Sequence, residues 1–316
     1  IGAADAAGVS WTLVDAPLDW LAGGAAAVAA GRAAIADAAQ NWGADLVQVN
    51  QPAYAGGDHP APVVAVAHSC VETWWRGTHG RPAPAEWAWH ARAVGEGLRA
   101  ASVVVAPSRS FAAMLQRTYG LGQPPVAVLN GIRPGAGPAE KGAFVLASGR
   151  VWDPSKNFAL LDAAAPAIHW PVQVAGDRTA PDGTGALLPR HLRCLGQLSP
   201  RAMAAQYAAA PVYVSPSLCE PFGLGVLEAA QAGAALVLSD IDTFRELWDG
   251  AGLFFDRRDP AALAAAVNRL IDEPVLRQRM AAAACRRVAR YSIAATAERM
   301  REVYALAAPE RARVSA

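Results

Sequence analysis

The chain has no excess of charge of either sign. Its 28 basic and 27 acidic residues give a net charge of +1, whereas nucleic-acid-binding domains usually carry a strong basic excess. No apolar run reaches the roughly 18 residues that a membrane span needs, and the first residues lack the basic start and apolar core of a signal peptide. We therefore expect a globular protein that binds no nucleic acid.

Cysteine is sparse and unpatterned. The four cysteines follow no CxxC spacing, which argues against a zinc site and a disulfide framework. A reducing cytoplasm fits this usage best, and we predict a cytoplasmic location.

Lysine is nearly missing. Of 28 basic residues only Lys141 and Lys156 are lysines. A lysine kept in so arginine-rich a chain is a candidate for a role that needs a compact ammonium group. Chance explains either one alone about equally well.

Short β-branched runs alternating with Ala- and Leu-rich stretches fill the chain. The 316 residues suffice for two domains of about 150 residues each. Several runs are apolar throughout, as in parallel strands covered on both faces. The expected strands are 10–16, 45–50, 62–69, 102–108, 125–131, 143–149, 171–176, 192–198, 211–217 and 234–240, and the expected helices include 86–101, 156–166 and 259–272.

The Gly- and Pro-rich segment 131–143 divides the chain into two halves. We interpret it as a linker. Each half repeats the βαβ pattern, so the fold class predicted is α/β with two doubly wound, Rossmann-like domains. Ligands of such sheets bind outside the carboxyl ends of the strands, and two such domains would face each other across a central cleft.

Polar residues follow the expected strand ends. They are His68, Arg150, Lys156, Asp177, Glu220 and Glu228, with glycines at 149, 176, 223 and 225. Two cations, a histidine and two carboxylates suit a ligand that carries a diphosphate and several hydroxyls. Gly223 and Gly225 precede an expected Ala-rich helix, whose first backbone N–H groups would face an anion.

Each signal also has an ordinary explanation. The glycines fit a tight loop, the cations a solvated surface, Glu228 a helix-dipole partner and His68 a satisfied rim residue. The "DID" at 240–242 could hold a metal, but it opens a helix, and we interpret Asp240 or Asp242 as a cap. The Trp-rich segment 72–90 is either an acceptor surface or packing.

Taken in order, these segments resemble the retaining glycosyltransferases of family 4, which have the GT-B fold. The resemblance is strongest in "LASGRVWDPSKNFALLDAA" and in "SPSLCEPFGLGVLEAAQAG", whose two glutamates stand eight positions apart. It extends to "VVAVAHS", "VAVLNGI" and the tail "YSIAATAERMREVYALA". It implies metal-independent transfer of a sugar from a nucleotide-diphosphate donor to an acceptor hydroxyl, with retention of anomeric configuration and no cofactor.

The resemblance also implies roles for single residues. Arg150 and Lys156, beside Gly149, would bind the donor diphosphate, and Glu228 would hold the ribose diol. Glu220 would position the donor sugar, helped by backbone N–H groups near Phe222, Gly223 and Leu224. His68 would stabilise positive charge at the anomeric carbon. In the usual proposal the leaving phosphate departs from the face that the acceptor attacks and helps to deprotonate the acceptor.

The family also suggests the domain roles. We expect an acceptor-side domain over 1–133, a donor-binding domain over 140–293, and a C-terminal helix within 294–316 that packs back on the first domain. The family's first strand and Gly-Gly loop do not occur in this sequence. Residues 1–16 are interpreted as the end of a helix and the second strand, and we expect the missing unit to precede them, because a sheet without its central strand would expose unpaired edges.

Alternatives stay open. A non-catalytic partner that binds nucleotide sugar, or a GT-B epimerase or phosphorylase, would fit many of the same residues. The acceptor can be a glycan, a lipid or a small metabolite. Peripheral membrane contact through the Arg-rich last helices is one option, and the sequence does not fix the oligomeric state.

Overall fold

The computed structural model describes residues 10–135, 139–180, 183 and 189–308. Contacts divide the chain into two units, Ile1–Leu129 with Ala294–Ala316 and Asn130–Ile293. Residues 130–133, which we had assigned to the first domain, belong to the second unit. Within the described residues, no helix combines the length and the apolar character needed to cross a bilayer.

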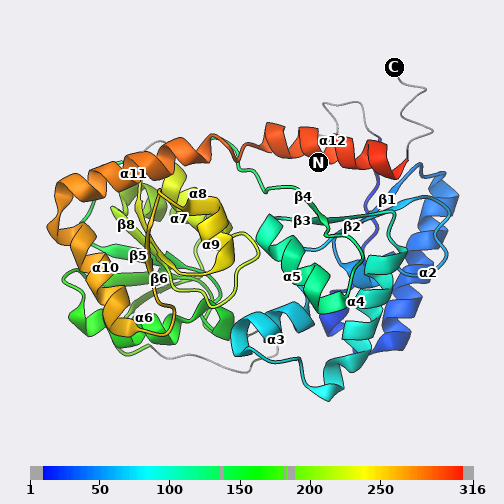
Figure 1. Cartoon of the computed structure of the whole chain (residues 1–316), viewed down its shortest axis with the longest axis horizontal. Coiled ribbons are helices and arrows are strands. Elements are labelled where there is room, and N and C mark those ends of the chain that lie inside the picture. The colour runs from blue at the N-terminus through cyan, green and yellow to red at the C-terminus, as the bar shows by residue number, and fades with distance from the viewer. Residues whose placement is uncertain (1–9, 136–138, 181–182, 184–188, 309–316) are drawn as a thin grey trace. The chain divides into compact units, whose positions relative to one another are not determined.

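Unit 1 is built on a four-stranded parallel sheet (Figure 1). Its strands lie in the order β1 (Val47–Val49), β2 (Val63–Val66), β3 (Val103–Ala106) and β4 (Val126–Ala127). Alternate side chains of β2 enter two different cores, Val63 and Ala65 on one face and Val64 and Val66 on the other. Because both faces are buried, these strands are apolar throughout, as parallel strands usually are.

Helices cover both faces of this sheet. The larger core includes side chains from α2 (Ala25–Trp42), α4 (Ala88–Ala100) and α5 (Arg109–Tyr119). On the other face α12 (Ile293–Ala307) packs Val303 and Ala307 against Val64, Val66 and Val105. The remaining elements of unit 1 are the short helices η1 (Asp19–Leu21), η2 (Pro52–Ala55) and η3 (Ala85–Trp87) and the helix α3 (Val71–His79).

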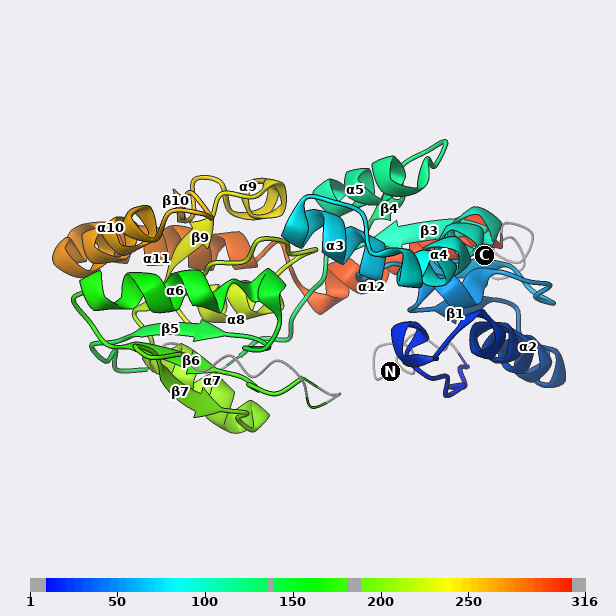
Figure 2. The ribbon, with the colours of Figure 1, turned by 90° about the horizontal axis from the view of Figure 1, so that it is seen from below.

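Unit 2 contains a six-stranded parallel sheet in the order β10-β9-β8-β5-β6-β7. Figure 2 shows the labels running from β10 and β9 through β5 to β6 and β7. The strands are β5 (Val145–Ser148), β6 (Val172–Ala175), β7 (Arg193–Gly196), β8 (Val212–Ser215), β9 (Ala235–Ser239) and β10 (Leu253–Phe255). In chain order this is the 3-2-1-4-5-6 arrangement of the Rossmann fold, whose strand order reverses between β5 and β8.

The helices of unit 2 complete the double winding. They are η4 (Pro154–Lys156), α6 (Phe158–Ala164), η5 (Ala165–Ala167), α7 (Pro200–Ala209), α8 (Leu224–Gln231), α9 (Asp242–Trp248), α10 (Pro260–Asp272) and α11 (Pro274–Val288). One core joins α6, α10 and α11 to alternate residues of β5, β6, β8 and β9. The predicted α/β class with two parallel sheets is confirmed.

The strand expected at 10–16 is wrong. These residues form no strand, and Trp11, Leu13 and Val14 are exposed, Leu13 to 77%. Their alternating apolar pattern is typical of a strand, but no neighbouring strand in the described residues pairs with them. The end of a helix expected in residues 1–9 lies outside the described residues. Strand β10 was not expected, because its three residues are too few to show a period.

Candidate functional site

The point where the strand order reverses lies between β5 and β8. Neighbouring parallel strands present their carboxyl ends at the same edge of a sheet, and crevices at such a reversal bind ligands in open α/β folds. The loop after β5 carries Gly149, Arg150 and Lys156, and the loop after β8 carries Glu220. The fold therefore brings together residues that lie about 70 positions apart in sequence.

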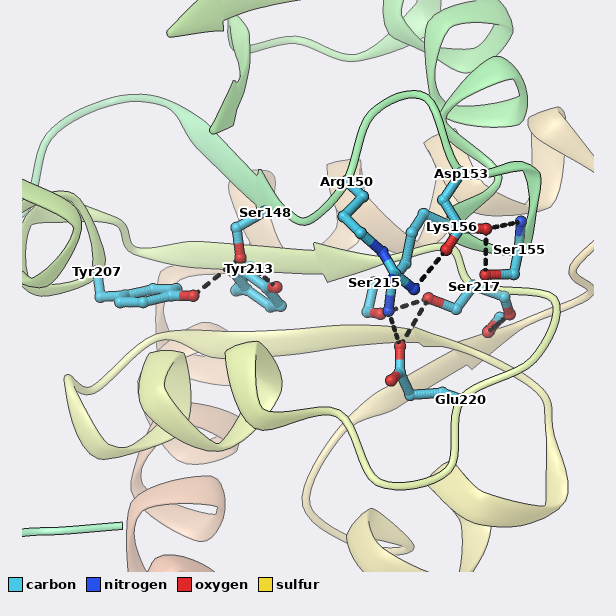
Figure 3. A network of polar contacts seen from close by, with 11 residues as sticks. Ser148, Arg150, Asp153, Ser155, Lys156, Tyr207, Tyr213, Ser215, Ser217 and Glu220 are labelled. Carbon is cyan, nitrogen blue, oxygen red and sulfur yellow. Dashed lines mark hydrogen bonds and ion pairs between the residues drawn. The ribbon is translucent and has the colours of Figure 1, made fainter. Parts of the chain in front are cut away.

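Lys156 and Glu220 are in direct contact (Figure 3). The Lys156 Nζ donates to Glu220 Oε2 at 2.5 Å, and the two side chains are 19% and 13% exposed. Ser217 Oγ lies 3.4 Å from the same oxygen, and Ser215 Oγ lies 3.3 Å from Ser217 Oγ. The pair is thus largely desolvated, so each charge depends on the other more strongly than in a surface ion pair.

Arg150 points into the same region but is paired differently. Its Nη2 donates to Asp153 Oδ2 at 2.6 Å, and its guanidinium lies 5.3 Å from the ring centre of Trp152. Asp153 is buried, and its Oδ1 also accepts from the backbone N–H and the hydroxyl of Ser155. One buried carboxylate therefore orients Arg150 and shapes the turn that carries Lys156.

The local sequence explains this turn. Asp153 is the N-cap of η4, and Pro154 occupies its first position, where a missing N–H costs nothing. Asn157 then ends η4 with φ of 55°, a left-handed conformation that asparagine tolerates better than most residues. Asp-Pro followed by a left-handed Asn is a turn signal that sequence inspection could have used to find Asp153, which we missed.

The start of α8 lies on the other side of Glu220. Gly223 is its N-cap with φ of +91°, a conformation suited to glycine. Leu224 is 47% exposed, whereas Phe222 is buried against Tyr291, with ring centres 5.7 Å apart. Because Phe222 is buried and Gly223 has no side chain, these two residues can serve a ligand only through backbone groups, as the first N–H groups of a helix do for anions.

Glu228 is not part of the Lys156 network. It is an exposed residue on α8, and its nearest titratable partner is Tyr207. Desolvation by the surrounding chain raises the pKa of Glu228, and the hydrogen bond with Tyr207 opposes that rise. Glu220 thus pairs with Lys156 and Glu228 with Tyr207, while the Tyr213 hydroxyl interacts electrostatically with both carboxylates.

A hydroxyl cluster supports the start of α8. Ser148 Oγ lies 2.8 Å from the Tyr207 hydroxyl and 2.9 Å from the Tyr213 hydroxyl (Figure 3). A Cβ on Gly225 would come within 2.7 to 3.1 Å of all three oxygens. Only glycine lets the helix start approach the cluster this closely.

His68 belongs to unit 1, two residues after β2. Its side chain reaches solvent, and partial desolvation lowers its pKa below the ordinary value. This shift favours the uncharged form of the ring.

Two minor expectations have different outcomes. The expected cap at 240–242 is wrong, because Ile241 is the N-cap of α9 and Asp240 instead pairs with Arg245 through both carboxylate oxygens, at 2.7 and 2.6 Å.

In the Trp-rich segment, Trp74 and Trp75 pack edge to face with ring centres 5.5 Å apart. An acceptor surface there stays a prediction.

Comparisons with known families match both halves of the chain. A family model described as "Glycosyltransferase Family 4" matches residues 8–135. A second, described as "Glycosyl transferases group 1", matches residues 142–273. The first match covers most of unit 1 and ends six residues into unit 2, and the second lies within unit 2.

Curated relatives are similar over part of their length. The phosphatidyl-myo-inositol mannosyltransferase of Mycobacterium leprae is 36% identical over 179 residues, which cover 54% of this chain and 48% of the relative. A D-inositol 3-phosphate glycosyltransferase of Thermomonospora curvata is 36% identical over 163 residues, covering 46% and 37%. The chain spans about half the length of the first curated relatives it matches.

Solved structures share the fold. Sucrose-phosphate synthase from Thermosynechococcus elongatus aligns with a TM-score of 0.74 at 21% identity, over 89% of this chain and 78% of that one. HepE of Anabaena, solved in complex with UDP and glucose, aligns with a TM-score of 0.69 at 19% identity, over 86% and 81%.

Proposed function

This chain belongs to the glycosyltransferases of family 4 with the GT-B fold, and from that premise we propose that it transfers a sugar from a nucleotide-diphosphate donor to an acceptor hydroxyl. We propose further that unit 2 binds the donor, that unit 1 serves the acceptor, and that transfer retains the anomeric configuration. The observation that carries the proposal is the Lys156–Glu220 contact at the reversal of the sheet.

The proposed roles follow from the chemistry of each group. Lys156 and Arg150 neutralise the diphosphate as it leaves, with the turn at Gly149 letting backbone approach it. Glu220 accepts hydrogen bonds from hydroxyls of the donor sugar, and Glu228 from the ribose diol. The N–H groups at the start of α8, at Gly223 and Leu224 after the buried Phe222, add donors for sugar oxygens.

The reaction proposed is a front-side displacement. The bond from the anomeric carbon to the phosphate oxygen breaks, the acceptor oxygen bonds to the same face, and the acceptor proton passes to the departing phosphate. His68 stabilises the positive charge that develops at the anomeric carbon. The two site cations supply the charge that a divalent metal supplies in other transferases, so no metal or cofactor is needed in this proposal.

The names of similar proteins suggest a class of donor and a class of acceptor. HepE was solved with UDP-glucose, and the curated relatives are named for transfer to inositol-containing acceptors. We therefore propose a nucleoside-diphosphate hexose as donor and a hydroxyl-rich acceptor, either a glycan, a lipid headgroup or a small polyol.

A panel of nucleotide sugars, assayed without added metal, tests the proposal. We expect release of nucleoside diphosphate from one donor, and a product whose anomeric proton coupling matches that donor. Glu220→Gln should lower turnover by at least about 100-fold, or about 2.7 kcal/mol. Glu273→Gln is the matched control, because that glutamate is exposed and its ion pair among the described residues is with Arg269 at 3.4 Å. Nucleotide binding without turnover on any donor would instead indicate a non-catalytic partner.

A further inference from the structure

The loop that carries Glu220 is held by side chains from three other parts of unit 2. We define the Glu220 loop as residues 216–223, between β8 and α8. The carbonyls of three successive loop residues accept hydrogen bonds from side chains. Asn157 Nδ2 donates to Pro216 at 3.1 Å, Ser239 Oγ to Ser217 at 2.6 Å, and Arg257 Nη1 to Leu218 at 2.9 Å.

These three donors come from separate parts of unit 2. Asn157 follows η4, Ser239 is the last residue of β9, and Arg257 follows β10. Two of them are also linked to each other, because Asn157 Nδ2 donates to the Arg257 carbonyl at 3.0 Å. The Leu218 N–H donates back to the Ser155 carbonyl at 2.8 Å, in the turn that carries Lys156.

Asn157 is adjacent in sequence to Lys156. Its backbone sets the left-handed turn that ends η4, and its side-chain amide fixes the first residue of the Glu220 loop. One residue therefore connects the two sides of the Lys156–Glu220 contact. Sites that stabilise a transition state depend on such fixed geometry, and displacements of about 1 Å can cost 100-fold in rate.

We propose that Asn157, Ser239 and Arg257 are positioning residues of the donor site. They hold the Glu220 loop so that Glu220 meets Lys156 before a donor arrives. The inference rests on the proposed function for its catalytic consequence, but the restraint on the loop can be measured without any substrate. None of the three residues was recognised as functional from the sequence.

Amide hydrogen exchange of the Glu220 loop tests the restraint directly. Asn157→Gly keeps the left-handed turn but removes the amide, and Arg257→Met removes the guanidinium donor. Each variant loses hydrogen bonds of ordinary strength, so we expect the backbone amides of 218–220, 222 and 223 to exchange about five- to thirtyfold faster. Exchange in β5, β8 and β9 should not change. Arg258→Met is the matched control, because that exposed neighbour makes its described hydrogen bond through its backbone.

Donor kinetics give the second readout. In Asn157→Gly we expect kcat/KM for the nucleotide sugar to fall about 10- to 100-fold. Inhibition by the nucleoside diphosphate alone, which lacks the sugar that Glu220 would contact, should change less than about threefold. If the variant were only less stable, catalysis with the donor and inhibition by the nucleoside diphosphate would weaken equally, and that result would overturn the positioning role.

The two readouts separate the two claims. Unchanged exchange of the Glu220 loop in both variants overturns the proposed restraint on this loop, whatever the activity. Faster exchange confined to the Glu220 loop supports the restraint. If the wild-type protein then shows no turnover on any donor, only the proposed function is wrong.

Discussion

The Lys156–Glu220 contact predicts a specific pattern of stability changes. Removal of one partner from a fully buried ion pair costs about 3–5 kcal/mol, and an exposed pair contributes about 0–1 kcal/mol. With side chains 19% and 13% exposed, this pair lies between those limits. We expect Lys156→Met to lower the free energy of unfolding by about 2 kcal/mol, because Glu220 then keeps only Ser217 as a close partner in the network.

Removing both charges should restore much of that loss. The variant that combines Lys156→Met with Glu220→Gln leaves no uncompensated charge, and we expect its free energy of unfolding to lie within about 1 kcal/mol of the wild type. The coupling energy of the cycle is then at least about 1 kcal/mol, even if Glu220→Gln alone costs nothing. Urea unfolding followed by circular dichroism measures all four proteins, and the slope against urea should stay constant.

An exposed pair provides the control for this cycle. Arg269→Met breaks the contact with Glu273, in which both side chains are more than half exposed, and should cost less than about 0.5 kcal/mol. If the losses of unfolding free energy in Lys156→Met and Glu220→Gln simply add in the double variant, the pair is not energetically coupled. The interpretation of a preformed site is then wrong.

Three further predictions concern unit 2. Lys141→Met should lower the free energy of unfolding by about 2 kcal/mol, because the Lys141 ammonium donates to three carbonyls near the ends of α7 and α8 at 2.8 to 3.0 Å. Thermal unfolding should show that Lys141→Arg is destabilised as well, because a planar guanidinium does not replace the compact ammonium. Gly225→Ala should cost about 1–3 kcal/mol by overpacking the hydroxyl cluster, measurable by the same unfolding assay. Titration of nucleoside diphosphate against pH should show binding lost on acidification, starting above the ordinary glutamate pKa of about 4.3. Desolvation by the surrounding chain raises the pKa of Glu228, and protonation weakens the carboxylate that we propose holds the ribose diol, so Glu228→Gln should remove that limb.

Much of the site could be predicted because the topology of the parallel sheet determines which loops lie next to one another. Parallel strands bring their carboxyl ends to one edge, so Arg150, Lys156 and Glu220 had to lie near one another once β5 and β8 were recognised as strands. The scarcity of lysine was informative as well. Lys156 forms the central ion pair, and the compact ammonium of Lys141 meets three carbonyls that a planar guanidinium could not reach together.

Other features depend on tertiary contacts that no local pattern records. Segment 10–16 has the composition of a strand, yet strand formation requires a pairing neighbour, and the described residues supply none there. Asn157 and Arg257 act through backbone carbonyls about 60 and 40 positions away, a separation at which sequence spacing carries no signal. Asp240 resembled a cap and proved to be the partner of Arg245.

The central claim is that the Lys156–Glu220 region of unit 2 binds the diphosphate of a sugar donor. The most direct test is calorimetric titration of nucleoside diphosphates into the wild type, Lys156→Met and Lys141→Met, at a temperature where all three are folded. These are the two lysines of the chain, and only Lys156 lies in the site. The account predicts binding that weakens at least about tenfold in Lys156→Met and stays within about twofold in Lys141→Met. Equal affinity in all three proteins would contradict it.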